Sequence, residues 1–335
     1  MFDYGRPVNQ RRADAEKLPR SVSQEAHRMV EHVHREQAAE IVVVGSANLD
    51  TTAHVPRLPA PGETVLGGDT GESVGGKGAN QAVAAARLGR SVAMVGRVGD
   101  DPAGRRIREA LTTQGVQVDQ LGSTAGSGSG AALIVVDESG ENMIVVAPGA
   151  NSTLTAAHVR AAQELLARAG AVVCQLEIPE EAVVEAVRLA GGRVILNPSP
   201  VRSVPPEVMA RVDVLIVNRS ELGAIAGAPE PRTVDDAAAL AAGVGGPGAV
   251  VVTLGADGAL LVDGNTRVHV PAVRVPTVVD PTGAGDTFCG ALTDALVRGE
   301  ALDGAVRWAV RAAALAVTGA GAQSAMPTAA QLATA

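Results

Sequence analysis

Short apolar runs alternate with longer segments of mixed polarity from residue 41 onward. The apolar runs are continuous and rich in valine, which is typical of strands buried on both faces of a sheet. They predict strands over residues 41–46, 92–96, 171–176, 193–197, 213–217 and 249–254. Alanine-rich segments between them predict helices over 77–88, 102–113, 155–169, 179–189, 234–242, 286–298 and 301–318. The alternation predicts an α/β fold with a mainly parallel central sheet flanked by helices.

Two stretches interrupt this alternation. Residues 51–75 have no helical pattern and carry three prolines, and residues 129–147 predict a hairpin with strands over 131–136 and 143–147. We expect the two stretches to form a small separate β-sheet. The hairpin strands are apolar on both faces, which is a hazard on an exposed sheet edge. A second copy of the chain would cover them, so we predict a homodimer through this small sheet.

The first 38 residues differ from the rest of the chain. They hold 13 of the 64 charged residues and half of the six histidines. We expect an extension that is mobile or forms a surface helix, followed by a single domain over 39–330. His27, His32 and His34 lack the i, i+4 spacing that would place two imidazoles on one helical face for a metal.

Composition excludes several classes of partner. Lys and Arg number 28 against 36 Asp and Glu, so the formal charge is −8, and aromatic residues make up 1% of the chain. An acidic chain without stacking rings is not expected to bind nucleic acid. No apolar run reaches the roughly 20 residues of a membrane span, and residues 1–40 lack the apolar core of a signal peptide. Cys174 and Cys289 lie in apolar runs, as expected for small buried hydrophobes in a reducing, cytoplasmic setting.

The strongest local signal is Asp-Pro-Thr-Gly-Ala-Gly-Asp-Thr-Phe over residues 280–288, after a predicted strand at 277–279. Gly283 and Gly285 would let a ligand approach the backbone, and free amides at a helix start attract a phosphate. Asp286 is then either a base that accepts a hydroxyl proton or a simple helix cap. The two glycines favour the base, because a cap does not need them. The helix start is expected to keep Asp286 ionised and only weakly basic.

Two further polar segments follow strands or open helices. Residues 75–81 place Lys77 and Asn80 at a helix start, but Gly78 stands where a P-loop needs Ser or Thr, so we reject a P-loop. Asn48 and Asp50 lie two apart on an extended segment and could both bond vicinal hydroxyls. The plainer alternatives are a tight solvated loop and a polar turn.

Polar or glycine residues also follow the later strands, and a glycine–serine run at 126–130 predicts a flexible hinge into the hairpin. The strand-end residues are Glu177, Asn197, Asn218, Glu221, Thr253, Gly255 and Gly258. Each alone is an ordinary loop residue or cap. Together they lie at the edge where an open α/β sheet binds ligands.

These segments in this order resemble the ribokinase-like family of carbohydrate kinases, from about residue 41 to 327. The matching segments are 45–50, 61–64, 75–82, 99–101, 175–177, 197–198, 218–221, 253–255, 280–288 and 321–323. The resemblance implies ATP-dependent phosphorylation of a sugar, with ribose phosphorylated at O5 as the leading expectation. The alternatives are a kinase of deoxyribose, fructose, a keto-deoxy sugar acid or a nucleoside, and a non-catalytic protein that senses sugars or nucleotides. A nicotinamide oxidoreductase is disfavoured, because no Gly-x-Gly-x-x-Gly follows the first strand.

The resemblance also implies that the small β-sheet is a lid that closes over the sugar, and it implies roles for matching residues. Asp286 would be the base, and the anion hole would comprise Gly283, Ala284 and Gly285. The sugar would be held by Asn48, Asp50, Gly76, Lys77, Asn80 and Glu177. Asn218 and Glu221 would place Mg²⁺ and phosphate, and Thr253, Gly255 and Gly258 would line the ATP pocket. A potassium ion would be held by Asp280, Thr282, Ala316, Gly319 and Gly321. Ser324 stands one place before the position where relatives often carry a cation-loop serine.

Overall fold

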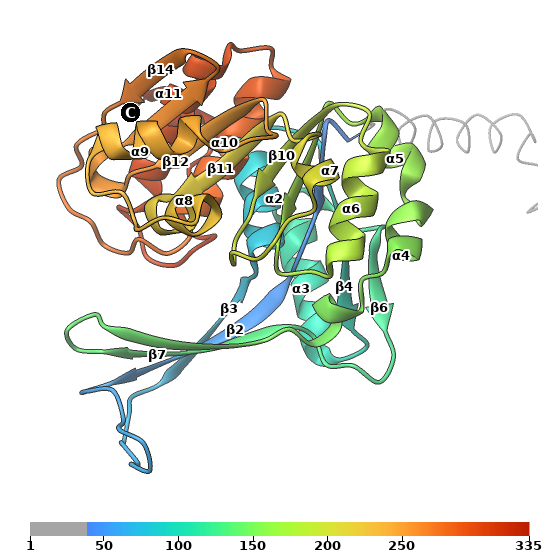
Figure 1. Ribbon diagram of the computed structural model, residues 1–335. Helices are drawn as coiled ribbons and strands as arrows, with labels where there is room; N and C mark the ends of the chain where they lie inside the picture. The colour runs from blue at the N-terminus through green and yellow to red at the C-terminus, as the bar shows by residue number, and fades with distance from the viewer. Residues whose placement is uncertain (1–38, 335) are drawn as a thin grey trace, which may run out of the picture. The chain divides into compact units, whose positions relative to one another are not determined.

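The computed structural model describes residues 39–334, so the predicted extension over 1–38 lies outside the described residues. Its main sheet has ten strands, of which nine follow the order β14-β13-β12-β11-β10-β9-β1-β4-β5 while β6 pairs with β4 (Figure 1). The strands are β1 (Ile41–Val44), β4 (Val92–Gly99), β5 (Val116–Gln117), β6 (Leu121–Thr124), β9 (Ala171–Gln175), β10 (Arg193–Asn197), β11 (Val214–Asn218), β12 (Ala249–Thr253), β13 (Ala259–Asp263) and β14 (Thr266–Val270). All pairs from β12 to β5 are parallel, while β13 and β14 pair antiparallel.

Successive strand residues enter two separate cores, one on each face of the sheet. In β1, Ile41 and Val43 pack into one core, and Val42 and Val44 pack into the other. The first core is covered by α2 (Lys77–Arg87), α3 (Pro102–Thr113), α10 (Ala284–Val297), α11 (Leu302–Ala316) and α12 (Ala329–Thr334). The second is covered by α4 (Ala156–Ala161), α5 (Gln163–Arg168), α6 (Glu180–Leu189), α7 (Pro206–Met209), α8 (Arg219–Ala226) and α9 (Val234–Ala242). The predicted α/β/α architecture is therefore confirmed.

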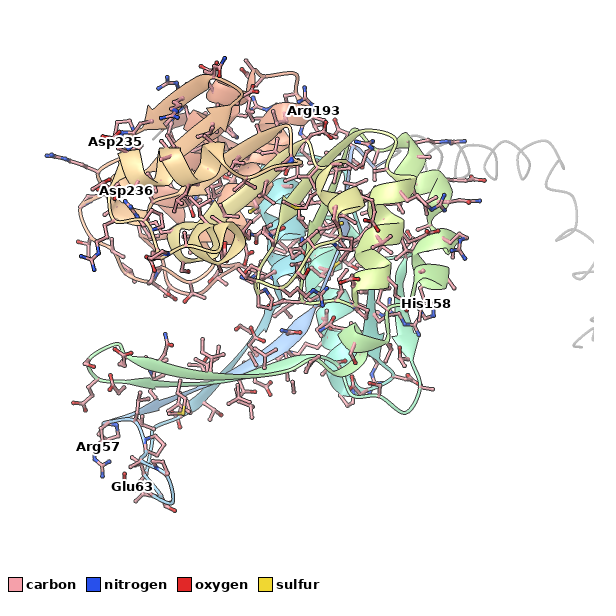
Figure 2. All side chains as sticks on the ribbon, viewed as in Figure 1. Arg57, Glu63, His158, Arg193, Asp235 and Asp236 are labelled. Carbon is pink, nitrogen blue, oxygen red and sulfur yellow. The ribbon has the colours of Figure 1, made fainter. Side chains whose placement is uncertain are left out.

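A second sheet of four strands lies below the main sheet in the view of Figure 1 and has the order β3-β2-β7-β8. Its strands are β2 (Asn48–Val55), β3 (Thr70–Gly75), β7 (Ala131–Asp137) and β8 (Asn142–Ala147). The small separate sheet is therefore present, and it is built from the two stretches that interrupt the α/β alternation. Arg57 forms a hydrogen-bonded ion pair with Glu63 in the loop between β2 and β3 (Figure 2).

Three local predictions are wrong. The predicted strand at 277–279 is irregular, and the amide of Val279 bonds the carbonyl of Val317 at 2.8 Å instead of joining a sheet. The predicted helix over 155–169 is two helices, α4 and α5, separated at Ala162. The late helix begins at Ala284 rather than at Asp286. Each difference depends on contacts with distant segments or on backbone angles that residue patterns do not specify.

The glycine–serine run before the hairpin is anchored rather than free. Asp101 caps α3 by accepting from the amide of Gly104 at 2.7 Å, and it also accepts from the amide and the hydroxyl of Ser129, both at 2.7 Å. The Ser129 hydroxyl in turn accepts from the amide of Gly99 at 3.0 Å. The flexible-hinge prediction therefore fails at Ser129, because the Asp101 carboxylate ties this residue to the start of α3.

Cys174 and Cys289 are both free and buried, which confirms their prediction as small hydrophobes. Of the helices in the described part of the chain, none has both the length and the apolar character to cross a bilayer.

Candidate active site

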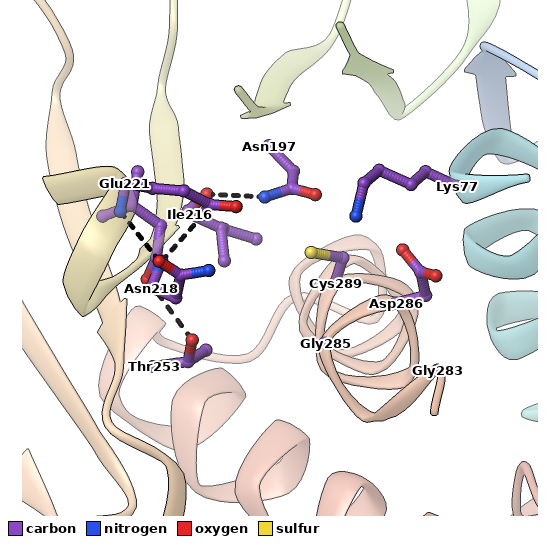
Figure 3. A pocket seen from close by; sticks show the side chains of 11 residues that line it. Lys77, Asn197, Ile216, Asn218, Glu221, Thr253, Gly283, Gly285, Asp286 and Cys289 are labelled. Atoms are coloured by element: carbon purple, nitrogen blue, oxygen red, sulfur yellow. Dashed lines mark hydrogen bonds between the residues drawn. The ribbon is translucent and has the colours of Figure 1, made fainter. Parts of the chain in front are cut away.

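A pocket lies where the carboxyl ends of β10, β11 and β12 meet the starts of α2 and α10. Its cavity is about 150 Å³ and is lined by Lys77, Asn197, Ile216, Val217, Asn218, Glu221, Thr253, Gly283, Gly285, Asp286 and Cys289. Figure 3 shows Lys77 and Asp286 on one side of the pocket and Asn218, Glu221 and Thr253 on the other. The structure therefore brings residues expected to serve the base, sugar and nucleotide functions into one cavity.

The start of α10 presents free backbone amides to this pocket. Gly283 precedes the helix with φ of 78°, a left-handed conformation that glycine adopts without strain. The amide of Ala284 donates to the carbonyl of Pro281 at 3.2 Å, but the amides of Gly285 and Asp286 have no acceptor within residues 39–334. A Cβ atom placed on Gly285 would meet nothing within 4 Å, so space for a ligand adjoins it. Such a helix start binds an anion through its N–H groups and its dipole.

Asp286 is the third residue of α10 rather than its cap, and its side chain points to α2. The carboxylate is 8% exposed. Its Oδ2 accepts from Asn80 Nδ2 at 2.9 Å and its Oδ1 accepts from Gln81 Nε2 at 3.0 Å. The cap interpretation is therefore wrong, because the side chain bonds another helix instead of its own first turn.

The basicity of Asp286 also differs from expectation. Burial raises the pKa of Asp286, while the Lys77 ammonium and the amides of Asn80 and Gln81 act against this rise. Burial disfavours a charged carboxylate because the surroundings solvate it less well than water does. Asp286 is therefore a stronger base than an ordinary aspartate, not the weak one that its place at a helix start predicts.

Asn48 and Asp50 lie at the start of β2, at the end of the small sheet where the chain leaves the main sheet. We call this end the base of the small sheet. Asn48 is 4% exposed, and its Oδ1 accepts from Asn151 Nδ2 at 2.8 Å. Asp50 Oδ1 accepts from the amide of Ala132 at 3.1 Å. Burial, with a contribution from the Glu177 charge, raises the pKa of Asp50 to about 6 despite that hydrogen bond. Because Asn151 occupies the Asn48 oxygen, Asn48 is left with its amide N–H groups to offer a ligand.

Glu177 links the loop after β1 to the start of α2 through two hydrogen bonds. Its Oε2 accepts from the Ser46 hydroxyl and from the backbone amide of Lys77 at 3.0 Å. Gly76, at φ of 87°, brings the chain so near Ala47 that a Cβ would lie 3.0 Å from the Ala47 Cα. Burial alone would lower the pKa of Lys77, but the charges of nearby carboxylates, Asp286 first among them, raise it. Lys77 therefore remains a cation at the pocket.

The opposite side of the pocket is built around the start of α8. Asn218 and Glu221 cap this helix reciprocally, with the Glu221 amide donating to Asn218 Oδ1 at 2.8 Å and the Asn218 amide donating to Glu221 Oε2 at 2.9 Å. Thr253 lines the same side. Gly255 and Gly258 lie outside the cavity wall and shape the turn η3 (Gly255–Asp257), both with positive φ.

Of the residues expected to hold a monovalent cation, Asp280 and Thr282 lie in the loop before α10, Gly319 and Gly321 lie in the loop after α11, and Ala316 is the last residue of α11 itself. Asp280 joins the two loops. Its Oδ1 accepts from the Thr282 amide at 2.9 Å and its Oδ2 from the Gly321 amide at 2.8 Å. Burial opposes ionisation, yet these hydrogen bonds hold the pKa of Asp280 below its usual value. The Asp280 carboxylate keeps lone pairs that these two amides do not use. Ser324 donates to the carbonyl of Ala320 at 2.6 Å and so closes the second loop.

Several residues of the site had no role in the sequence prediction. Gln81, Gln175 and Gln323 connect to Asp286 directly or through one amide, and Asn151 holds Asn48. Cys289 lines the cavity one helical turn after Asp286. Asn197, noted only for its strand-end position, also lines it. The one signal that could have found Gln81 is its place beside Asn80 at the same helix start.

Comparison with protein families identifies a match over most of the chain. Residues 38–329 match the pfkB family of carbohydrate kinases. The ribokinase of Bacillus subtilis (strain 168) is 41% identical over 291 residues, which cover 86% of this chain and 96% of that protein. The deoxyribokinase of Salmonella typhi is 35% identical over 294 residues, which cover 86% of this chain and 95% of that protein.

A solved structure gives the same assignment of fold. The structure of Arabidopsis thaliana ribokinase complexed with ribose and ATP superimposes with a TM-score of 0.82 at 33% sequence identity. The match covers 89% of this chain and 98% of that one.

Proposed function

The chain belongs to the pfkB family of carbohydrate kinases, and from this premise we propose that it is an ATP-dependent ribokinase that phosphorylates ribose at O5. The observation that carries the proposal is the buried Asp286 carboxylate beside the free amides at the start of α10. A base and an anion site at one place are what transfer of a phosphoryl group to a hydroxyl requires.

In the proposed reaction the O5 hydroxyl of ribose attacks the γ-phosphorus of ATP. The O5–P bond forms, the bond from phosphorus to the β,γ-bridging oxygen breaks, and ADP leaves with that oxygen. Asp286 takes the hydroxyl proton as the new bond forms. The Gly285 amide, with its neighbours Gly283 and Ala284 at the start of α10, faces the transferring phosphoryl group and stabilises its charge. A hydroxyl is much less acidic than a carboxylic acid, so the proton moves late.

We propose that ribose lies between the first residues of α2 and the base of the small sheet. Asn48 offers amide donors, while Asp50 and Glu177 offer acceptor oxygens to the sugar hydroxyls. Gly76, Lys77 and Asn80 complete this side. The nucleotide lies across the pocket, against Thr253 and the glycines of η3.

Two cations complete the proposal. Asn218 and Glu221 would hold Mg²⁺, which would neutralise phosphate charge, and the loops joined by Asp280 would hold K⁺, which would add positive charge near the anion hole. Both fit the oxygen-rich donor sets of these two segments. The residues of this chain orient the sugar, hold the proton acceptor in place and aim the amides at the phosphoryl group.

Deoxyribose is the second candidate substrate, because the deoxyribokinase of Salmonella typhi covers as much of the chain as the ribokinase of Bacillus subtilis does. The two sugars differ by one hydroxyl. A site whose buried polar groups pair with that hydroxyl discriminates strongly against the sugar that lacks it. A nucleoside is disfavoured by the shortage of aromatic residues for stacking on its base.

We also propose that two copies of the chain pair through the small sheet. Met143, Ile144, Val145 and Val146 of β8 are 46% to 59% exposed. Such a run of exposed apolar side chains on an edge strand invites cover.

Ribose with ATP should release ADP faster than deoxyribose, fructose or a nucleoside does in a coupled assay. Asp286→Asn should reduce kcat by about 10²–10⁴-fold while ATP and ribose still bind, because the proton acceptor is lost but the shape is kept. The control is Asp100→Asn, whose side chain is exposed. Strong turnover of another sugar with none of ribose would refute the substrate, and near-normal turnover by Asp286→Asn would refute the base.

Acid pH should weaken ribose binding before it unfolds the protein. The pKa of Asp50 is raised to about 6, so its protonated form accumulates below that pH and loses acceptor capacity for sugar hydroxyls. The KM for ribose should therefore rise by about tenfold per pH unit at most below pH 6. Asp50→Asn should have a high KM that no longer varies with pH. A KM of the parent enzyme that is flat from pH 5 to 8 would contradict this role.

Replacing K⁺ by Na⁺ at constant ionic strength should lower kcat, because the smaller ion fits a loop of fixed backbone oxygens poorly. Asp280→Asn should abolish the difference between the two ions, since the carboxylate that joins the loops is lost. Choline chloride serves as the control for ionic strength. Equal rates in K⁺, Na⁺ and choline would exclude the cation site.

Multi-angle light scattering should give twice the mass of the chain. Ile144→Glu and Val145→Glu are neighbours on β8, so they point to opposite faces and distinguish which face is covered. At least one of them should yield a monomer, whereas Val273→Glu, at an exposed valine outside the small sheet, should not. A parent protein that is monomeric at micromolar concentration would refute the dimer.

A further inference from the structure

The Asp286 carboxylate receives one hydrogen bond on each oxygen, and the two donors differ in surroundings. Asn80 is 7% exposed, and its oxygen accepts from Gln323 at 3.0 Å. Gln81 is 1% exposed, and neither side chain lines the cavity. Gln81 is therefore the more enclosed of the two donors and lies out of reach of a sugar.

Gln81 is held in one orientation from two sides. Its Oε1 accepts from Gln175 Nε2 at 2.6 Å, and its Nε2 faces Asp286 Oδ1 at 3.0 Å and Asn197 Oδ1 at 3.2 Å. Asn197 cannot turn over, because its own Nδ2 donates to the Ile216 carbonyl at 3.0 Å. An amide nitrogen has two hydrogens, so Gln81 supplies one to each acceptor.

This orientation of Gln81 and Gln175 leaves one buried oxygen without a hydrogen bond in the described part of the chain. Gln175 Oε1 is buried and has no hydrogen-bond partner within the described residues. Turning the Gln175 amide over would set its oxygen against the Gln81 oxygen. Turning Gln81 as well would aim an oxygen at the Asp286 carboxylate and at the Asn197 oxygen. An unsatisfied buried carbonyl costs free energy, so its presence indicates a requirement elsewhere in the network.

We propose that Gln81, held by Gln175 and Asn197, is a positioning residue that fixes the direction of the Asp286 carboxylate and keeps it ready to accept the sugar proton. The inference rests on the proposed kinase function and adds to it a group that touches neither substrate nor phosphate. The chain of contacts runs from β9 and β10 through α2 to α10, so it also ties the base to the strands that end at the pocket.

The charged and titratable groups around Asp286 remain in place when Gln81 is changed. Lys77 faces it from α2, Glu177 faces it from the loop after β9, and the neutral Cys289 thiol lies on its own helix. A change at Gln81 therefore removes one N–H donor from Asp286 and no charge. A hydrogen bond to a charged group is worth about one to two pKa units.

The test is Gln81→Met, which keeps the length of the side chain and removes the donor. Expected results are an acid limb of kcat/KM about one to two pH units higher, and a kcat on the plateau above that limb roughly tenfold to hundredfold lower because the carboxylate is no longer held in one direction. The KM for ribose should stay within about threefold of the parent value, because sugar contacts are unchanged. The control is Val83→Ala on the same helix, a buried residue whose loss destabilises without touching the network.

Two further measurements separate positioning from mere stability. In an Asp286→Asn background, Gln81→Met should not lower the residual turnover further, because the two residues act as a unit. Gln175→Met leaves Gln81 in the chain but removes the donor that holds the Gln81 oxygen. It should therefore move the acid limb in the same direction by a smaller amount, and it replaces the first variant if Gln81→Met does not fold. An acid limb that stays at the parent pH in both variants, or additive losses in the double variant, overturns the inference.

Failure of the inference differs from failure of the proposed function. If the parent enzyme phosphorylates a different sugar of the panel, the same comparison is made with that sugar and the inference is judged on it. If the parent enzyme phosphorylates none, the kinase proposal fails first and the positioning role fails with it.

Discussion

The structure depends on the burial of one carboxylate at the junction of two helices. Asp286 loses most of its hydration when α10 packs on α2, and among the described residues the groups that offset this loss, Lys77, Asn80 and Gln81, all lie on α2. Asn80 and Gln81 can reach it because the helices approach closely, at Gly290. A Cβ on Gly290 would come to 2.5 Å from that of Ala84. The close crossing, the two donors and the raised basicity of the carboxylate are consequences of a single packing arrangement.

The parallel sheet explains how such distant residues meet. Gln81 and Asp286 are separated by 205 positions, and Gln81 and Asn197 by 116. Strands β9, β1, β10, β11 and β12 all run in the same direction, so their carboxyl ends share one edge. Polar residues placed just after each strand therefore meet along that edge without further cost, and the two helices cover it from one side.

The small sheet has a firm base and an exposed far end. Asn151 holds Asn48 at the base, and Asp101 holds Ser129 where the chain enters β7. All of β8 is exposed, so its apolar residues contribute little to the stability of the described fold. The firm base keeps Asp50 and Asn48 in register with the pocket, while the far end is left for contacts beyond this chain.

Local pattern alone was enough for several helices and strands of the α/β layer, although it missed α8, β13 and β14. Valine-rich runs buried on both faces and capped helices depend on neighbours within a few residues, which is why β10 (Arg193–Asn197), α3 (Pro102–Thr113) and α9 (Val234–Ala242) have the predicted bounds. The glycines around Asp286 likewise indicated a ligand before any contact was known. Tertiary structure decided the rest. Three properties of Asp286 depend on burial and on groups about a hundred or two hundred positions away. They are whether it caps its own helix or bonds α2, how basic it is, and which amide holds it. Burial and long-range contacts leave no periodic trace in a sequence, so the bond from Gln81 to Asp286, and any role of Gln175, could be recognised only once the helices and strands had been brought together.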